Sequence, residues 1–259
     1  ERRKAADLFH PLKHLFWRTL AMACATFFDV SGAHAQSTTT PVLEDSDHRT
    51  STSLDGDWHY LVDPYFSGLY TFHHEEKKDG WFLNSKAQSS DPGPIDYDFA
   101  KAPTLRVPGD WNMQSDRLFF YEGPLWYQRD FNFTPTAGKR TFLHIGAANY
   151  RAWLWVNGKL ACTHEGGFTS FDCEVTYLVH AGSNFIVAAV DNTRLPDGVP
   201  TLETDWWNYG GLTRDVFLVD VPQRFVDDFD LHLVQGQTKS IEGYVHVQGA
   251  ATGVSVTVS

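Results

Sequence analysis

The chain has 259 residues, a formal net charge of −11 at pH 7 and an aromatic content of 15%. The negative charge argues against a nucleic-acid partner, because binding a polyanion needs concentrated basic charge. No run of eighteen apolar residues occurs, which argues against an ordinary membrane-spanning helix. The length and the aromatic content predict a large β-rich core in one domain, or in one and a half.

The first 35 residues have the three parts of an export signal. A basic segment over 1–18 is followed by mostly small or apolar residues over 19–32 and then by Ala33-His34-Ala35. The alternative is an amphipathic helix of the folded protein. We expect a signal peptide over 1–35, cut after Ala35, and therefore a periplasmic or secreted protein. Ser, Thr and charged residues dominate 36–52, which predicts a linker.

Short segments that alternate apolar and polar residues fill the region 53–221. Gly, Pro, Asn or Asp bound most of them, and Asn157-Gly158 is a strong hairpin signal between two of them. No helical periodicity accompanies them, so we expect an all-β fold with an antiparallel β-sandwich. The polar segment 63–103 predicts a long loop insertion. The predicted strands are 58–62, 104–107, 127–133, 142–145, 152–156, 159–163, 185–191 and 212–221.

The last part of the chain, 222–259, has the same alternating pattern. Strands are predicted over 225–234, 241–247 and 254–258. Three strands cannot close a sandwich, so this part predicts the beginning of a second β-domain.

Two cysteines, Cys162 and Cys173, follow the predicted signal peptide. An oxidising compartment permits a disulfide between them. Cys173 alternates with Phe171 and Val175, however, which is typical of a side chain buried in a core. We therefore expect two free core thiols in preference to a disulfide. Neither cysteine has the spacing of a metal site, and we expect no metal ion.

One stretch carries most of the chemistry: Asp205-Trp206-Trp207-Asn208-Tyr209, followed by Gly210-Gly211. Flat aromatic faces beside a carboxylate and an amide suit a sugar ring, whose C–H faces are apolar and whose hydroxyls need partners. The alternative is an aromatic loop that plugs the end of the sandwich. Composition alone favours the plug, because most Trp residues serve packing.

Six segments in order resemble the N-terminal sugar-binding domain of the family 2 glycoside hydrolases, the β-glucuronidase and β-galactosidase group. They are 54–58 (LDGDW), 107–112 (VPGDWN), 121–127 (YEGPLWY), 164–171 (HEGGFTSF), 191–194 (DNTR) and 205–216 (DWWNYGGLTRDV). The resemblance implies a jelly-roll (galactose-binding-like) sandwich over 53–221. It also implies that 222–259 begins an immunoglobulin-like domain, with a catalytic (β/α)₈ barrel downstream.

In that family both catalytic glutamates lie on the barrel, so we assign no catalytic residue to this chain and expect no cofactor. The resemblance implies a retaining exo-β-glycosidase that removes terminal β-linked glucuronide or galactoside units. The alternative is a free-standing carbohydrate-binding module without hydrolase activity. The sequence leaves open whether the protein forms a homo-oligomer.

The resemblance also implies the site residues. The aspartate at the position of Asp205 hydrogen-bonds the terminal sugar in the pocket of the barrel, and a carboxylate suits this role because it accepts from two neighbouring hydroxyls. We expect Trp207 and Asn208 to take part in substrate binding, by shaping the rim or by holding the loop. The alternative for Asp205 is a loop aspartate that caps its own turn. The expected partners are a carbohydrate and the barrel of the same protein.

Overall fold

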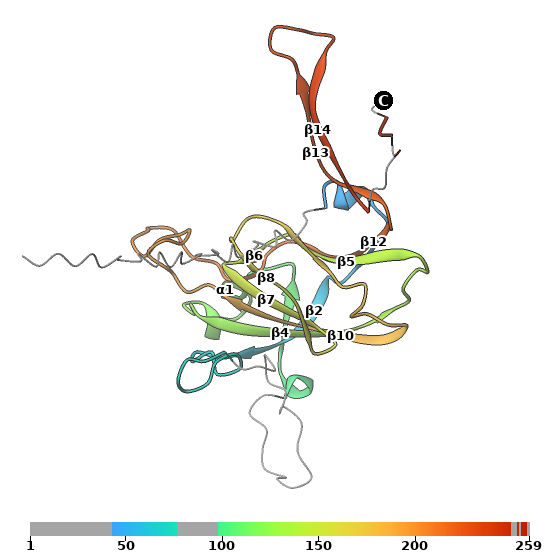
Figure 1. The fold of residues 1–259 in the computed structure, drawn as a ribbon. Helices are drawn as coiled ribbons and strands as arrows, with labels where there is room; N and C mark the ends of the chain where they lie inside the picture. The colour runs from blue at the N-terminus through green and yellow to red at the C-terminus, as the bar shows by residue number, and fades with distance from the viewer. Residues whose placement is uncertain (1–42, 77–97, 250–252, 254, 258–259) are drawn as a thin grey trace, which may run out of the picture. The chain divides into compact units, whose positions relative to one another are not determined.

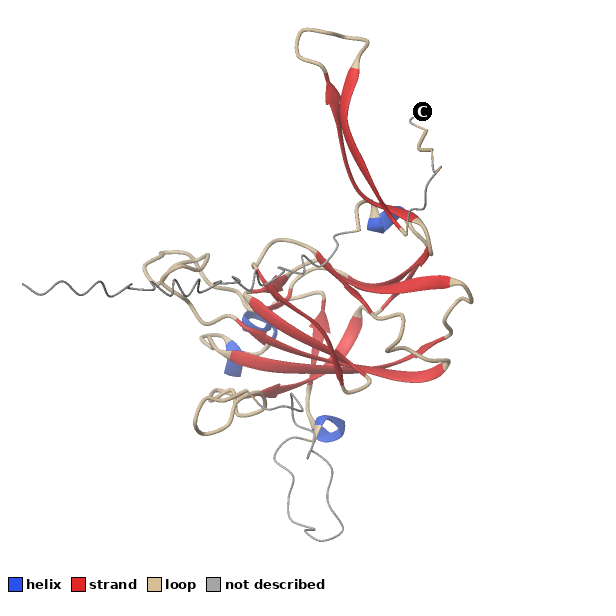
Figure 2. Ribbon diagram, viewed as in Figure 1, coloured by secondary structure: helices blue, strands red, loops and turns tan. Residues whose placement is uncertain are grey.

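The computed structural model describes residues 43–76, 98–249, 253 and 255–257. The predicted signal peptide lies outside these residues, as do parts of the predicted linker and of the predicted strand 254–258. Nearly all regular structure in the described part of the chain is β-strand (Figure 2), which confirms the predicted all-β class. In that part, no helix has the length and apolar character needed to cross a membrane.

The strands occur where alternation predicted them, with three short additions and one exception: the described residues 255–257 of the predicted strand 254–258 are not in a strand. The additions are β1, β6 and β9, and the predicted strand 212–221 is divided into β11 and β12. The strands are β1 (Ser51–Ser53), β2 (Gly56–Val62), β3 (Thr104–Val107), β4 (Pro124–Phe133), β5 (Lys139–Ile145), β6 (Ala148–Asn149), β7 (Arg151–Val156), β8 (Lys159–Glu165), β9 (Phe171–Glu174), β10 (Gly182–Asp191), β11 (Gly211–Leu212), β12 (Val216–Pro222), β13 (Phe225–Leu233) and β14 (Ile241–Gln248). The helical pieces are α1 (Trp111–Gln114) and the 3₁₀ turns η1 (Ser46–His48), η2 (Phe99–Lys101) and η3 (Asp116–Leu118).

Two antiparallel sheets form the sandwich (Figure 1). One has the strand order β1-β12-β5-β9 and the other the order β3-β2-β4-β10-β7-β8. Alternate side chains of both sheets meet in one buried cluster, to which Leu143 and Leu218 contribute from the first sheet and Trp58, Tyr127 and Leu154 from the second. The predicted sandwich is therefore confirmed, and its core is the space between the sheets.

The outer face of the larger sheet is also covered. Trp126 and Trp155 stack there at 5.4 Å between ring centroids, and Phe66, Leu69 and Phe99 pack over the same cluster. These three residues come from the described ends of the insertion 63–103. Residues 124–127 of β4 and 186–190 of β10 are thus buried on both faces, which explains their continuous apolar runs.

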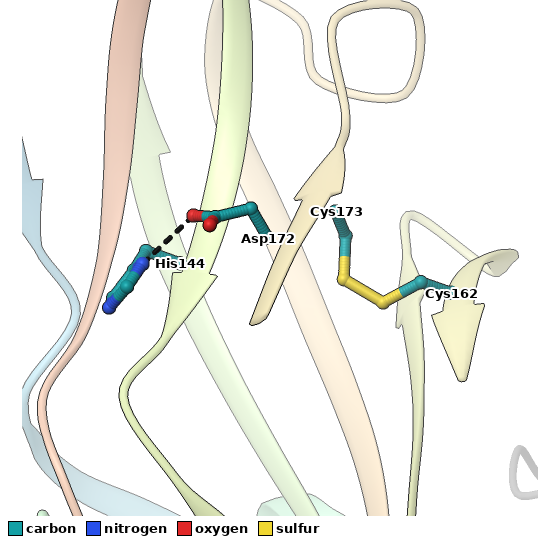
Figure 3. The surroundings of a disulfide bond; sticks show 4 residues. All are labelled: His144, Cys162, Asp172 and Cys173. Atoms are coloured by element: carbon teal, nitrogen blue, oxygen red, sulfur yellow. Dashed lines mark hydrogen bonds and ion pairs between the residues drawn. A yellow bond between two sulfur atoms is a disulfide. The ribbon is translucent and has the colours of Figure 1, made fainter. Parts of the chain in front are cut away.

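The two cysteines form a disulfide, so the prediction of two free thiols was wrong (Figure 3). Their Cα atoms lie 5.7 Å apart, within the usual range for a disulfide. Cys173 does face the core, as its alternation with Phe171 predicted. A side chain in the core lies between the two sheets. Cys173 on the smaller sheet therefore meets Cys162, which is on β8 of the larger sheet. The bond joins β8 and β9, which are one edge strand of each sheet.

A buried polar group next to this disulfide holds the beginning of the described chain (Figure 3). Nδ1 of His144 donates to the fully buried carboxylate of Asp172 at 2.8 Å. The second oxygen of Asp172 accepts from the backbone N–H of Leu43, also at 2.8 Å. Asp172 on β9 therefore fixes the chain at Leu43 to the sandwich.

Strands β13 and β14 pair with each other as an antiparallel hairpin. Its base is attached to the sandwich, because the ring of Phe225 packs on Phe142 at 5.7 Å between centroids. Farther along, Phe229, Leu233 and Tyr244 are exposed. Within the residues that the structure describes, no other strand pairs with this hairpin. The predicted start of an immunoglobulin-like domain at 222 stays a prediction.

Candidate functional site

Two of the sequence segments, 107–112 and 121–127, contact one loop, residues 192–210, which connects β10 to β11 and contains parts of the segments 191–194 and 205–216. The loop has no regular secondary structure between 192 and 210 apart from turns and bends. Hydrogen bonds of side chains, both from the loop itself and from neighbouring segments, therefore determine its path. Those contacts involve buried asparagines, a glycine pair and one arginine.

Asn208 holds the middle of the motif in place. Its side-chain oxygen accepts from Nδ2 of Asn149 on β6 at 2.9 Å, and the same nitrogen donates to the carbonyl of Tyr209. Nδ2 of Asn208 donates to the carbonyl of Asn192. With only 3% of its surface exposed, Asn208 serves here as an internal anchor of the loop. Direct contact of this amide with a sugar would require these bonds to be exchanged.

The Gly210-Gly211 pair is explained by close contact with the segment that contains α1. The N–H of Gly210 donates to Oδ1 of Asn112, and its carbonyl accepts from the N–H of Trp111, both at 2.9 Å. A Cβ at Gly210 would overlap the Trp111 indole. Gly211 has φ +137°, a conformation that side chains resist. The two glycines therefore let the loop lie directly on a buried tryptophan.

Arg194 forms hydrogen bonds to the part of the loop that contains Asp205. Its Nε donates to the carboxylate of Glu122, at 3.0 and 3.2 Å from the two oxygens. Its Nη1 donates to Oγ1 of Thr204 at 2.6 Å, and its Nη2 donates to the carbonyl of Trp206 at 3.3 Å. The guanidinium thus bonds the residues immediately before and after Asp205.

Asp205 itself lies at the surface with its side chain exposed. The neighbouring Trp206 is 60% exposed, and Trp207 is partly exposed against other rings. Trp207 lies 4.9 Å from Phe119, 5.5 Å from Phe120 and 6.3 Å from Tyr209, measured between ring centroids. We call these four rings, Phe119, Phe120, Trp207 and Tyr209, the aromatic platform.

The aromatic platform has features of both alternatives raised by the sequence, an aromatic plug of the sandwich and a sugar-binding surface. Its rings pack on one another, as in a plug, and all of them keep exposed surface, as in a binder. Phe119 and Phe120 were not identified from the sequence, because they follow η3 in a segment without a motif of its own. Their pairing with Trp207 bridges about ninety residues of sequence. An exposed carboxylate beside flat aromatic faces can accept from hydroxyls while the rings contact C–H groups.

Burial keeps the hydroxyl of Tyr121 protonated. It raises the pKa of Tyr121, and the nearby carboxylates of Asp63 and Asp191 raise that pKa further. The hydroxyl of Tyr121 therefore stays protonated and donates to the carbonyl of Pro124 at 2.6 Å.

Among the described residues, no cluster of three His, Cys, Asp or Glu side chains could hold a metal ion.

Comparison with known proteins places this loop inside a shared domain. The family model described as "Glycosyl hydrolases family 2, sugar binding domain" matches residues 52–222. The β-glucuronidase of Felis catus is 31% identical over 179 residues, which is 57% of this chain and 28% of that protein. The β-glucuronidase of Mus musculus is 27% identical over 237 residues, which is 80% of this chain and 34% of that protein.

A solved structure gives the same result. The β-glucuronidase of Bifidobacterium dentium, complexed with coumarin-3-O-glucuronide, has a TM-score of 0.55 and 26% identity, and the match covers 75% of this chain and 33% of that one. The chain therefore spans about a third of the length of the proteins it matches. The matched region of the family model includes the whole loop 192–210.

Proposed function

Because the chain belongs to the family 2 glycoside hydrolases, whose sugar-binding domain it contains, we propose that the whole protein is a retaining exo-β-glucuronidase. The names of the relatives support this proposal, since the proteins cited above are β-glucuronidases that match 57% to 80% of this chain. The proposal assigns the acid/base and the nucleophile to a catalytic barrel elsewhere in the protein. This chain contributes the non-catalytic sandwich.

The proposed role of Asp205 is to accept hydrogen bonds from two hydroxyls of the terminal sugar. Its exposure on an anchored loop supports this role, because a side chain that binds a sugar must be accessible to the sugar and held in position. In this proposal Trp207 and the aromatic platform contact the apolar faces of the substrate. Asn208 contributes by fixing the loop, since its amide is occupied inside the protein.

We also propose that the protein is exported. The basic, apolar and Ala-x-Ala sequence over 1–35 supports export. The Cys162–Cys173 disulfide supports it as well, because structural disulfides persist mainly in oxidising compartments. Microsequencing of the mature protein from its native host should give Gln36 as the first residue. A protein that retains 1–35 would contradict the proposed cleavage.

The activity is tested on the full-length protein with matched aryl β-glycosides. We expect hydrolysis of the β-glucuronide with a kcat/KM at least ~10²-fold above that of the β-galactoside, because a site that binds a charged group discriminates strongly against substrates that lack it. Preference for the galactoside would replace the proposed substrate with the other member of the group. Binding of sugars without any hydrolysis would favour a carbohydrate-binding module.

The role of Asp205 is tested by Asp205→Ala in the same protein. We expect kcat/KM to fall by ~10²-fold or more, because the proposal gives Asp205 two charge-assisted hydrogen bonds and each contributes about 1.5–3 kcal/mol. Asp197→Ala is the matched control, since Asp197 is another exposed aspartate of the same loop. Unchanged kinetics of Asp205→Ala in a folded protein, or an equal loss in the control, would refute the role.

A further inference from the structure

We propose that Arg194 is the positioning residue for Asp205, and that Glu122 holds Arg194 in the orientation this requires. The inference rests on the proposed function of Asp205 and adds the mechanism by which its carboxylate is aimed. Arg194 bonds to Thr204 and to the carbonyl of Trp206, so it fixes the backbone on both sides of Asp205. A side chain whose two neighbours are fixed keeps its Cα and Cβ in one place.

The clamp is built on the rigid part of the sandwich. In the antiparallel pairing of β4 with β10, Asp191 lies opposite Pro124. Glu122 precedes the start of β4 and Arg194 follows the end of β10. The two residues therefore lie at the same end of two adjacent strands. Their ion pair at 3.0 Å therefore connects two fixed points, and the loop is attached to it.

The other anchors of the loop cannot replace this clamp. Asn192, Asn149 and Asn112 bond Asn208, Tyr209 and Gly210, all of which follow Asp205 in the sequence. On the preceding side, Thr204 is bonded by Arg194 through both its hydroxyl and its carbonyl. Removing Arg194 would thus leave the C-terminal half of the loop in place and release the segment that carries Asp205.

The bonding pattern also separates this role from direct substrate binding. Each of the three guanidinium nitrogens donates to an acceptor of the protein: Nε to Glu122, Nη1 to Thr204 and Nη2 to Trp206. The Arg194 side chain is 19% exposed, less than its partner Glu122 at 37%. A lysine could not reproduce this planar fork, because an ammonium is a single point of charge.

The test is a double-mutant cycle in the full-length protein, using Arg194→Ala, Asp205→Ala and the combination. We expect Arg194→Ala to lower kcat/KM by roughly tenfold or more, since misplacing a contact group by about 1 Å can cost 10²-fold. We expect the double variant to be no less active than Asp205→Ala alone, because Arg194 acts only through Asp205. Glu122→Gln and Arg194→Lys should give smaller losses of the same kind. The matched control is Arg214→Ala, an exposed arginine beyond the loop, which should leave kcat/KM unchanged.

Each outcome decides between two explanations. If the losses of the single variants multiply in the double variant, Arg194 has a separate role and the inference is overturned. A full effect of Asp205→Ala with none from Arg194→Ala overturns the inference and leaves the proposed function intact. No effect of Asp205→Ala overturns both. Thermal unfolding is recorded for every variant, and if Arg194→Ala does not fold, the cycle is repeated with Arg194→Lys, to which the same outcomes apply.

Discussion

Asn192 and Asn208 exchange hydrogen bonds across the loop that carries the candidate site. Nδ2 of Asn192 donates to the carbonyl of Asn208 at 2.8 Å, and Nδ2 of Asn208 donates to the carbonyl of Asn192. Both side chains are buried, with exposures of 0% and 3%. The pair therefore closes a sixteen-residue excursion with two side-chain-to-backbone bonds, in a place where no strand pairing is present. A polar loop of this kind loses stability when one of its buried groups loses a partner.

This arrangement predicts a large cost for Asn208→Ala. The change removes two donor–acceptor bonds of the side chain and leaves Nδ2 of Asn149 and the carbonyl of Asn192 short of a partner inside the protein. We expect the free energy of unfolding, measured with urea, to fall by about 2–4 kcal/mol. Asn132→Ala on the exposed face of β4 is the control and should change it by less than about 0.5 kcal/mol. A similar small change for both variants would contradict the anchoring role.

The disulfide predicts a second measurable effect. Cys162 and Cys173 are eleven residues apart, and closing a loop of this size stabilises the folded state by about 2–3 kcal/mol. We expect the double variant Cys162→Ala/Cys173→Ala to unfold at a lower urea concentration than the oxidised parent. Dithiothreitol should shift the parent towards the variant and leave the variant unchanged. Equal midpoints for oxidised parent and variant would show that the bond does not contribute to stability.

The sequence predicted the positions of the longer strands, because these depend on the pattern of neighbouring residues. In β4 the apolar residues within 127–133 all lie an even number of positions apart, and β10 has a continuous apolar run, so both strands were located within a few residues. Strand β6, with two residues, is too short to produce a pattern, and the alternation of Phe171 with Cys173 in the four-residue β9 indicated burial but was too short to predict a strand. The break after Leu212 was missed as well, because one strand was predicted from Leu212 to Val221 across the polar residues Thr213-Arg214-Asp215.

Contacts between distant residues could not be predicted in the same way. Glu122 and Arg194 are 72 residues apart, and Asn149 and Asn208 are 59 apart. Glu122, Arg194 and Asn208 belong to motifs that the sequence identified, but a motif does not specify the partner of its residues, and Asn149 lies outside these motifs. The same limit explains the error about Cys173, whose burial was predicted correctly while its partner on the other sheet was not.

The ion pair between Arg140 and Glu174 connects β5 to β9 and predicts a dependence of stability on pH. Nε and Nη2 of Arg140 donate to the two carboxylate oxygens at 2.8 and 2.7 Å. This bidentate contact lowers the pKa of Glu174, against a smaller opposing effect of burial. Because the pKa of the folded state lies below that of the unfolded state, the pair stabilises the fold above about pH 4.3, the ordinary pKa of glutamate. This stabilisation is lost as the pH falls through the lowered pKa.

Glu174→Gln tests this dependence. Glu174 is about one-third exposed, so we expect the variant to be only ~1 kcal/mol less stable than the parent at pH 7, less than a buried charged bond would give. The difference in the free energy of unfolding should shrink as the pH is lowered from 5 towards 2, because the parent's carboxylate then becomes protonated and resembles the neutral amide. Glu203→Gln, at an exposed glutamate, controls for the loss of one negative charge. A difference that stays constant or grows in acid would mean that Arg140 does not stabilise the charged form of Glu174.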